Sequence, residues 1–562
     1  MHRLVPDHAR TYVVGINVAS QVFFQTMNSL VSAYHTNYRA PLFTTALLVL
    51  TLLQSSTFSL SLAFRGPLAS DTFISLITLL WLAMYAFAAV GLFASFGFNW
   101  ITWIVRYRLL LTCLLAGTMF STAWSVDTAL TAERSTHLIG TTIVAIYLGL
   151  SLPLNRMLRI SAVTLGLLMV GSIFIALLVP ELGMVDYQGN LVWRGVLASK
   201  NTLGFWAAIT LLLSVNLCFW TLSTGQRVLY LSIVLVSLVC IYHSVSATSL
   251  LALITATLVM VYLHAAFSLR LNIVAMTLLG VFVVGFVGVA FVFIDTAELI
   301  GRSGDLTGRG EVWSQTWQLI LNRPLTGYGY GTIWFPTDKT LWIQQSLTDF
   351  SWTVYHAHNG LLQLASEIGL PLTALALLMI MQQLVEVICC QYRRQQPGVL
   401  FVMGFLVALL VSNYSEARLL INRELYWVFF IALPISMLQQ VSVMAIRQNT
   451  NLAPGQVAAN DAYKLREVRL RKEQKLNVKD RVKKLSELRV INPKATDSPE
   501  RDDKLVPVSQ AEINNTFPFE SNDSTDDSIK NSNSVIGANS TRAYTNKEAR
   551  RLMKTRQPKK AG

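Results

Sequence analysis

Apolar residues are gathered into runs of roughly 16 to 28 positions, close to the ~20 that a helix needs to cross the ~30 Å hydrocarbon core of a bilayer. The runs do not alternate between apolar and polar positions, as the shorter strands of a membrane barrel would. Helices also satisfy their own backbone polar groups within lipid. The pattern predicts an all-α polytopic integral membrane protein with about twelve transmembrane helices, over residues 42–64, 72–96, 109–126, 137–152, 158–179, 203–222, 228–242, 249–267, 271–294, 361–389, 399–414 and 425–446.

Polar segments divide the chain into three parts. Residues 1–40 contain a semi-apolar stretch that polar side chains interrupt, and we expect a cytoplasmic N-terminal segment without a cleavable signal peptide. The transmembrane domain follows over 41–446, with a long polar outer loop at 295–357. Within that loop, the amphipathic stretch 309–322 has an apolar face suited to the membrane surface. Residues 447–562 form a basic tail that we expect to be largely disordered and cytoplasmic.

Positive charge in the short loops favours one orientation in the membrane. With the N-terminus inside, the cytoplasmic side collects eleven cations: Arg3, Arg10, Arg39, Arg106, Arg108, Arg156, Arg159, Arg227, Arg270, Arg393 and Arg394. The outer side then holds six: Arg65, Arg134, Arg194, Lys200, Arg418 and Arg423. By the positive-inside rule, this bias predicts both termini in the cytoplasm and the 295–357 loop outside. If residues 13–32 also cross, the N-terminus alone moves to the outer side.

The bulk composition agrees with a membrane protein, because 53% apolar and 14% charged residues with a mean hydropathy of +0.47 do not suit a soluble chain. Most of the net charge of +14 lies in the tail. The tail's Lys and Arg are mixed with acidic residues and lack interleaved aromatic side chains, so we expect no nucleic-acid partner. The five cysteines fall in or beside apolar runs without CxxC spacing, which predicts neither a disulfide framework nor a cysteine metal site.

The segment from Tyr355 to Gly360 carries the strongest chemical signal, at the point where the long loop re-enters the membrane. His358 offers an imidazole that accepts a proton near neutral pH, and Asn359 offers an amide that can orient it or bind a sugar hydroxyl. A simpler interpretation is that these residues cap the following helix, for which Asn359 is well suited. The pattern leaves catalysis and capping open.

A second polar group lies at residues 193–204, between two predicted spans. Arg194, Lys200 and Asn201 suit an anionic headgroup, and an arginine grips phosphate oxygens with two parallel hydrogen bonds. Snorkelling of the two cations toward the membrane surface explains the same pattern. Both interpretations stay open.

Two further polar segments could carry chemistry. The glycine run after Asn322 follows no strand and lacks a P-loop lysine, so it predicts close-packed turns rather than a nucleotide site. Near the last span, Glu416 has Arg418 and Arg423 close to it in sequence. We predict a structural ion pair between Glu416 and one of these arginines, because charges at the mouth of a helix bundle are usually paired.

Six segments, in this order along a multi-span chain, resemble the O-antigen ligase and polymerase family, especially its exopolysaccharide-polymerase branch of the succinoglycan type. They are WRGVLASKNTLG (193–204), HSVSATSLL (243–251), TGRGEVW (307–313), RPLTGYGYG (323–331), HAHNGLLQLASEIGLP (356–371) and NYSEARLL (413–420). The resemblance covers residues 109–446 and implies a membrane bundle of the GT-C kind. Such enzymes join glycans carried on undecaprenyl diphosphate at the outer face of the bacterial inner membrane.

The resemblance also implies roles for single residues. Arg194 becomes a contact to the donor diphosphate, Arg309 a second basic contact in the outer loop, and Lys200 a further donor-binding cation. His358 becomes the catalytic group that activates the acceptor hydroxyl. The residues expected to support this site are Asn201, Asn359, Glu416 and Arg418. No metal is implied, and no Asp-x-Asp cluster stands in an outer loop to hold one.

The implied activity is that of an inverting, metal-independent glycosyltransferase that needs no cofactor. Its substrates are an undecaprenyl-diphosphate-linked oligosaccharide and a glycan or lipid acceptor, with membrane lipids around it and a chain-length regulator and a flippase as candidate partners. Ligases tend to place a small residue or Tyr three positions after the residue that is Gly369 here. This chain has Leu372 there and Thr373 next, which favours a polymerase of exopolysaccharide or O-antigen repeat units.

Two alternatives remain from the sequence. Within the family, the protein is an O-antigen ligase that joins the glycan to a lipid or protein acceptor. In another class, it is a transporter or flippase of lipid-linked oligosaccharide. Transport is less favoured, because flippases need charge deep within the bundle and often show internal repeats. This chain has few charges in its spans and no visible repeat.

Overall fold

The computed structural model describes residues 42–55, 71–187, 189–268, 280, 281, 285, 309–335, 337–347, 354–394 and 397–450. The predictions for residues 1–40 and for the tail beyond Thr450 lie outside the described residues, as does most of the predicted span 271–294. For Arg309 the structure describes the backbone, which begins a helix, but not the side chain.

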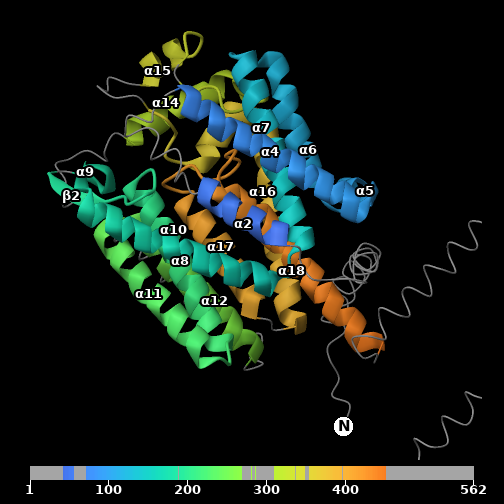
Figure 1. Cartoon of the computed structure of the whole chain (residues 1–562). Coiled ribbons are helices and arrows are strands. Elements are labelled where there is room, and N and C mark those ends of the chain that lie inside the picture. The colour runs from blue at the N-terminus through green and yellow to red at the C-terminus, as the bar shows by residue number, and fades with distance from the viewer. Residues whose placement is uncertain are drawn as a thin grey trace, which may run out of the picture. The chain divides into compact units, whose positions relative to one another are not determined.

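Helices make up nearly all of the described part (Figure 1). The longer ones are α2 (Leu42–Ser55), α4 (Asp71–Phe96), α5 (Asn99–Tyr107), α6 (Leu109–Phe120), α7 (Thr128–Ser151), α8 (Leu154–Leu178), α10 (Lys200–Trp220), α11 (Thr224–Ser244), α12 (Ala247–Ser268), α14 (Arg309–Asn322), α16 (Gly360–Arg394), α17 (Pro397–Ser412) and α18 (Leu425–Thr450). The short ones are η2 (Ser121–Trp124), α9 (Pro180–Gly183) and α15 (Leu341–Leu347). One feature departs from the predicted all-α class: β1 (Met184–Tyr187) and β2 (Asn190–Trp193) form an antiparallel hairpin.

Seven helices are long and apolar enough to cross a membrane, and an eighth span results if α5 and α6, bent by 94°, count as one. The seven are Leu76–Phe96, Leu154–Leu178, Lys200–Trp220, Thr224–Ser244, Ala247–Ser268, Gly360–Gln391 and Leu425–Ser442. The predicted spans 42–64 and 399–414 correspond to the shorter apolar helices α2 and α17. The chain is therefore a multi-pass helical membrane protein, while the predicted number of twelve spans is not confirmed.

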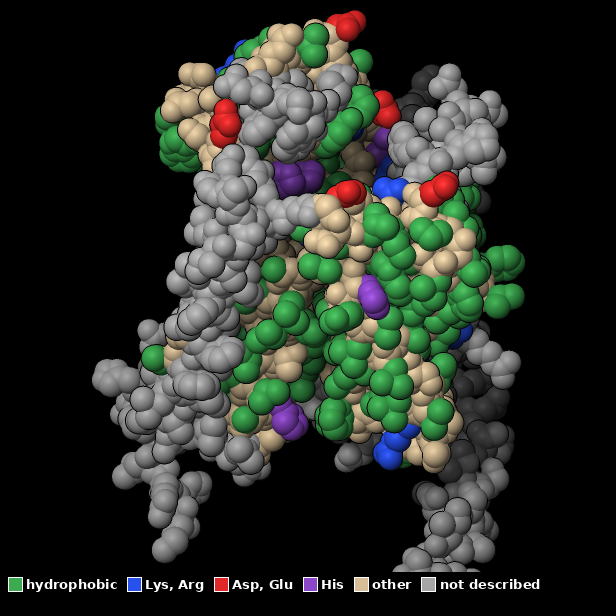
Figure 2. Space-filling view, turned by 90° about the vertical axis from the view of Figure 1, so that its left-hand side faces the viewer, with side chains coloured by type: hydrophobic (Ala, Val, Ile, Leu, Met, Phe, Trp, Pro, Cys, Tyr) green, Lys and Arg blue, Asp and Glu red, His purple; other side chains and the backbone are tan. Residues whose placement is uncertain are grey.

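Burial separates central helices from those that face lipid. The span in α18 is 100% buried and the span in α10 is 72% buried, whereas the span in α11 is 22% buried. Large apolar side chains are exposed along α4, α8 and α11, and Figure 2 shows hydrophobic side chains over much of the lower part of one face. Because lipid tails are as apolar as these side chains, helix association here depends on close packing. At Gly149 of α7, for example, a Cβ would lie 2.9 Å from the carbonyl oxygen of Ala432 in α18.

A buried ion pair holds the bend between α5 and α6. Arg108, at the break, donates a hydrogen bond of 2.8 Å from Nη1 to Oε1 of Glu386 in α16, and both side chains are largely buried. The pair lies toward the end of α16 that is remote from Gly360, so it joins these helices at the end of the bundle opposite the His358 loop.

A break in α16 receives a turn of the preceding loop. Gly369 has φ 77° and ψ 167° inside the helix, and Pro371 begins the second segment. The turn that starts at Pro324 fits into the break: the Leu370 amide donates to the Pro324 carbonyl over 2.8 Å. A Cβ on Gly369 would lie 2.3 Å from the carbonyl oxygen of Leu325, so this approach requires glycine. The loop is thereby fixed on the start of α16.

The amphipathic helix predicted over 309–322 is present as α14, with those bounds. Its apolar face does not simply lie along a membrane surface, because Val312 and Leu319 are buried in a second apolar cluster formed with the following loop. Trp317 and Leu321 remain exposed. In Figure 1, α14 and α15 lie together at the upper end of the bundle. They form a cap whose apolar cluster also includes Ala357 of the His358 loop.

Candidate functional site at one end of the helix bundle

The His358 loop is built around the start of α16. Asn359 caps that helix, since its Oδ1 accepts hydrogen bonds of 3.1 Å from the amides of both Leu361 and Leu362. Its Nδ2 donates to the carbonyl of Tyr414 over 3.2 Å. The capping interpretation is therefore correct for Asn359. His358 precedes it with φ 51°, in the left-handed region that is uncommon for residues other than glycine.

Two histidines and a carboxylate meet in this loop. The ring centroids of His356 and His358 are 3.9 Å apart, and the Nδ1 atom of His356 accepts a hydrogen bond of 3.2 Å from the His358 backbone amide. On the other side, Nε2 of His356 lies 3.9 Å from Oε2 of Glu416. Glu416 in turn accepts a hydrogen bond of 2.6 Å from Nδ2 of Asn201. Figure 2 shows histidine side chains below the uppermost part of the molecule.

The start of α10, the junction between α11 and α12 and the loop after α17 are joined behind this group. Oδ1 of Asn201 accepts a hydrogen bond of 3.1 Å from Ser246, whose hydroxyl is also 2.8 Å from that of Ser249. Ser415 donates to Thr248 over 2.8 Å. Asn201 therefore has a defined amide orientation, with nitrogen toward Glu416 and oxygen toward Ser246. Four of the six sequence segments thus meet here.

The other two segments support the same loop. Trp313 of α14 donates from Nε1 to the carbonyl of Ala357 over 3.0 Å, and its ring lies edge-on to Tyr414 at 5.9 Å. In the glycine run, the amide of Tyr328 donates to the Ser366 carbonyl over 3.0 Å. The prediction that the glycine run forms close-packed turns is confirmed. Gly327, Gly329 and Gly331 all have positive φ, and a Cβ on any of them would collide with neighbouring atoms.

Arg194 and Lys200 border the hairpin. The backbone amide of Arg194 donates to the Gly183 carbonyl over 2.9 Å, and its Nε donates to the Leu182 carbonyl over 3.1 Å. Partial burial lowers the pKa of the Arg194 guanidinium, which still stays protonated at neutral pH. Lys200 donates to the Val245 carbonyl over 3.1 Å and lies 3.2 Å above the ring of Tyr187. Both cations thus lie near Asn201 at the start of α10.

The predicted ion pair between Glu416 and Arg418 or Arg423 is wrong: between these described side chains the structure has none. Arg418 is buried and donates to Ser412 and Tyr426, so it braces the loop from within. Arg423 points to His137 of α7 instead. Sequence proximity suggested the wrong partner because Glu416 bonds to Asn201, 215 residues away.

Among the described side chains, one group has the residue types and spacing of a metal-ligand set. It consists of His356, His358 and Glu416, with one potential ligand atom from each within 4.8 Å of the others. A metal-binding histidine normally donates its second ring N–H to a neighbour. His356 does the reverse, because its Nδ1 accepts an amide hydrogen. In neutral His356 the ring proton is then on Nε2, which has no lone pair for a metal. The arrangement fits proton chemistry better than a resident metal.

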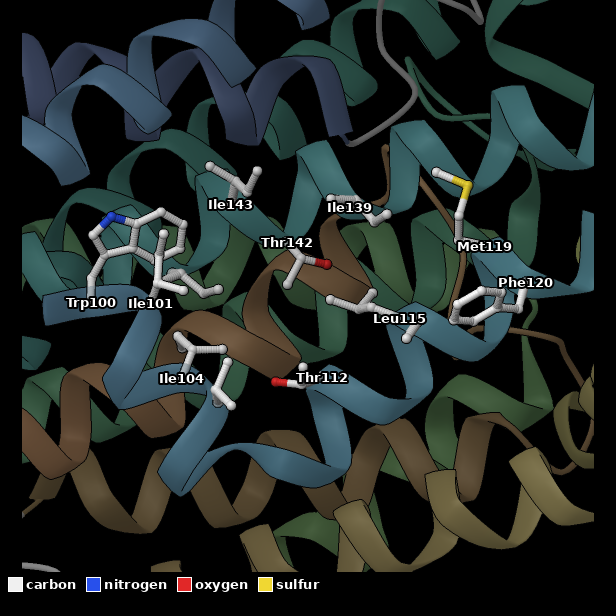
Figure 3. Close-up of a pocket in the computed structure, with 13 residues that line it drawn as sticks. Trp100, Ile101, Ile104, Thr112, Leu115, Met119, Phe120, Ile139, Thr142 and Ile143 are labelled. Atoms are coloured by element: carbon white, nitrogen blue, oxygen red, sulfur yellow. The ribbon is translucent and has the colours of Figure 1, made fainter. Parts of the chain in front are cut away.

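An apolar groove of about 410 Å³ lies at a different place, between α5, α6 and α7 (Figure 3). Trp100 and Ile104 come from α5, Leu115 and Met119 from α6, and Ile143 from α7. Its lining has almost no polar groups, so it suits an apolar chain and offers no chemistry.

Comparison with known proteins finds one family that resembles part of the chain. Residues 232–377 match the family model described as O-antigen ligase. The matched interval contains His243 to Leu251, α14, the glycine run and the His358 loop, and the structure brings the segments at 193–204 and 413–420 to the same loop. No curated protein matches the chain. The chain is thus a multi-pass membrane protein in which residues 232–377 are similar to the O-antigen ligase family.

Proposed function

We propose that the protein is a glycosyltransferase that moves glycan from undecaprenyl diphosphate to an acceptor hydroxyl outside the bacterial inner membrane. Its preferred reaction is polymerisation of exopolysaccharide or O-antigen repeat units. One observation carries the proposal: six segments that resemble this family, spread over more than 220 positions, interlock around His356 and His358 at one end of a membrane bundle. A structural helix cap alone would need Asn359 but neither histidine.

The chemistry follows from the groups available. His358 takes the proton of the acceptor hydroxyl, whose oxygen attacks the anomeric carbon and displaces the diphosphate with inversion. Negative charge grows on the leaving diphosphate, and Arg194 and Arg309 are the cations that stabilise it, with Lys200 beside them. In a partly dehydrated site one such donor contributes roughly 100- to 1,000-fold in rate. No step requires a metal.

Polymerisation is preferred to ligation because Leu372 stands where ligases tend to have a small residue or Tyr. In the structure Leu372 packs against Gly117 of α6, where a Cβ would lie 2.6 Å from its side chain. Ligation to a lipid or protein acceptor stays as the alternative within the family. Transport is disfavoured because the interlocked polar groups gather at one end of the bundle rather than along a path through it.

The test uses purified protein in detergent with undecaprenyl-diphosphate-linked repeat units and EDTA. Longer glycans must form, because detergent leaves no compartment to transport across and the proposed reaction has no metal. His358→Ala should abolish the product, and His356→Ala should be milder. Product that depends on an added divalent metal would contradict metal independence. Full activity of both His358→Ala and Arg194→Ala would refute the assigned site.

Arg194→Lys examines the diphosphate contact separately. Lysine keeps the charge but loses the planar fork of donors, so we expect a loss of roughly 10- to 100-fold in rate if the guanidinium binds two phosphate oxygens. The matched control is Arg323→Lys, because Arg323 is an exposed cation of the outer loop whose guanidinium lies over Tyr328. Equal activity of Arg194→Lys and the parent protein would show that a generic cation suffices.

A further inference from the structure

The hydrogen bonds of His356 determine where its ring proton lies. A backbone amide can only donate, so Nδ1 of His356 must present its lone pair to the amide of His358. The proton of the neutral ring is then on Nε2, which faces Oε2 of Glu416 at 3.9 Å. This distance is within ion-pair range and too long for a direct hydrogen bond, so the carboxylate acts on His356 through its charge.

Asn201 holds the Glu416 carboxylate by a hydrogen bond to one of its two oxygens. The side chain of Glu416 is 12% exposed, and Asn201 donates a hydrogen bond of 2.6 Å to Oε1, which leaves Oε2 directed at His356. Lys200 donates to the Val245 carbonyl, and Arg418 donates to Ser412 and Tyr426. A carboxylate this buried gains from an adjacent positive charge, and the histidine pair acquires one when it accepts a proton.

We propose that Glu416 is the positioning residue of the histidine pair: through His356 it fixes the orientation of His358 and stabilises the positive charge that forms there. The inference deepens the proposed function and rests on it for the identity of the proton donor. The role is that of the third group in a base-and-orienter arrangement, which holds a catalytic imidazole without touching substrate. The left-handed backbone of His358, adjacent to the Asn359 cap, agrees with a loop that is held rather than relaxed.

The step balances as follows. The acceptor O–H bond breaks and its proton goes to Nε2 of His358, because Nδ1 of that ring is shielded from solvent. The hydroxyl oxygen forms the new bond to the anomeric carbon, and the electron pair of the broken glycosyl bond stays on the diphosphate. His358 becomes an imidazolium, with its ring 3.9 Å from that of His356. The carboxylate of Glu416, 3.9 Å from Nε2 of His356, compensates the new charge.

The first test is Glu416→Gln, which keeps the acceptor for Asn201 but removes the charge. Nitrogen NMR of ring-labelled histidines in nanodiscs follows the protonation of His356 and His358 without any need for activity. We expect their titration midpoints to fall by about one pH unit or more, because the imidazolium loses its nearest carboxylate. Glu181→Gln is the control, since it removes an exposed carboxylate beside the hairpin. Unchanged midpoints in a folded Glu416→Gln protein would overturn the proposal.

The second test separates the local hydrogen bond from the charge. In His356→Asn, the amide oxygen can still accept from the His358 amide, but no ring reaches Glu416. We expect a roughly tenfold or greater loss of rate, and little further loss when Glu416→Gln is added, because both changes remove one interaction. Additive losses would show independent roles and refute the coupling. If the parent protein makes no glycan at all, the proposed function fails, while the NMR titration still decides the positioning role.

Discussion

Asn359 serves two segments with one side chain. Its oxygen satisfies two amides at the start of α16, and its nitrogen holds the carbonyl of Tyr414 in the loop after α17. The first amides of a helix have no acceptor within the helix, so they otherwise donate to water or to another side chain. The residue therefore sets the position of His358 from one side, while the backbone bond from Gly360 to Asn413 sets it from the other.

Substitution of Asn359 should separate capping from chemistry. Asn359→Ala should lower stability by about 1 kcal/mol, the usual cost of losing a cap, and should reduce activity further by releasing the loop. Asn359→Ser keeps a capping oxygen but cannot reach Tyr414, so it should preserve stability and still lose rate. Thermal unfolding in detergent and the glycan assay check the two effects. Equal thermal stability of Asn359→Ala and the parent protein would argue against a capping role.

The sequence predicted which residues could carry the chemistry but not which side chains they contact. His358 and Asn201 stood out because their residue types suit proton transfer and phosphate positioning. Glu416 also stood out, but its predicted partner was a neighbouring arginine. The contact to Asn201 could not be predicted, since it depends on how α10 and the loop after α17 meet in space. Trp313 was predicted to face the membrane surface, and its indole instead supports Ala357.

At the scale of elements, the broken helix α16 connects the membrane bundle to the site. A straight helix would direct its first turn away from the glycine run. The break at Gly369 lets the turn after Pro324 approach, and Glu367 then accepts a hydrogen bond of 3.0 Å from the Gly331 amide. The sequence pattern predicted a continuous span here, because hydropathy does not reveal a single residue with left-handed backbone.

Gly369→Ala should disrupt this junction. The new methyl group would need a backbone conformation nearly restricted to glycine and would collide with the carbonyl of Leu325, so we expect a loss of about 3 kcal/mol or more. Gly225→Ala is the matched control, because Gly225 lies in the first turn of α11 with nothing within 4 Å of the added atom. Thermal unfolding in detergent measures both variants. Similar stability of the two would mean that the break is not needed.

At the scale of the molecule, hydropathy predicted the long apolar helices most securely. The spans in α8, α10, α11 and α12 lie close to their predicted positions, because their apolar runs are long and uninterrupted. The helix α7 was predicted as a short span at 137–152 and in fact starts at Thr128. Its first turns carry Glu133 and Arg134, whose charge conceals a helix from a hydropathy pattern although α7 packs closely on α18.

The side of the membrane on which the site lies is predicted by the cation bias, and the fold makes that prediction easy to test. The hairpin, the His358 loop and the start of α10 share one end of the bundle, while the start of α11 is at the other end. In a variant without its five native cysteines, Asn190→Cys and Thr224→Cys provide exposed probes at the two ends. Ser509→Cys probes the tail.

An impermeant maleimide added to intact cells or spheroplasts should label Asn190→Cys and leave Thr224→Cys and Ser509→Cys unmodified until the membrane is opened. The physical reason is that Arg and Lys concentrate in the loops on the Thr224 side, and such loops are retained in the cytoplasm. Labelling of Thr224→Cys with protection of Asn190→Cys would invert the protein. His358 would then face the cytoplasm, and an enzyme acting on glycans already carried to the outer face could not reach its substrate.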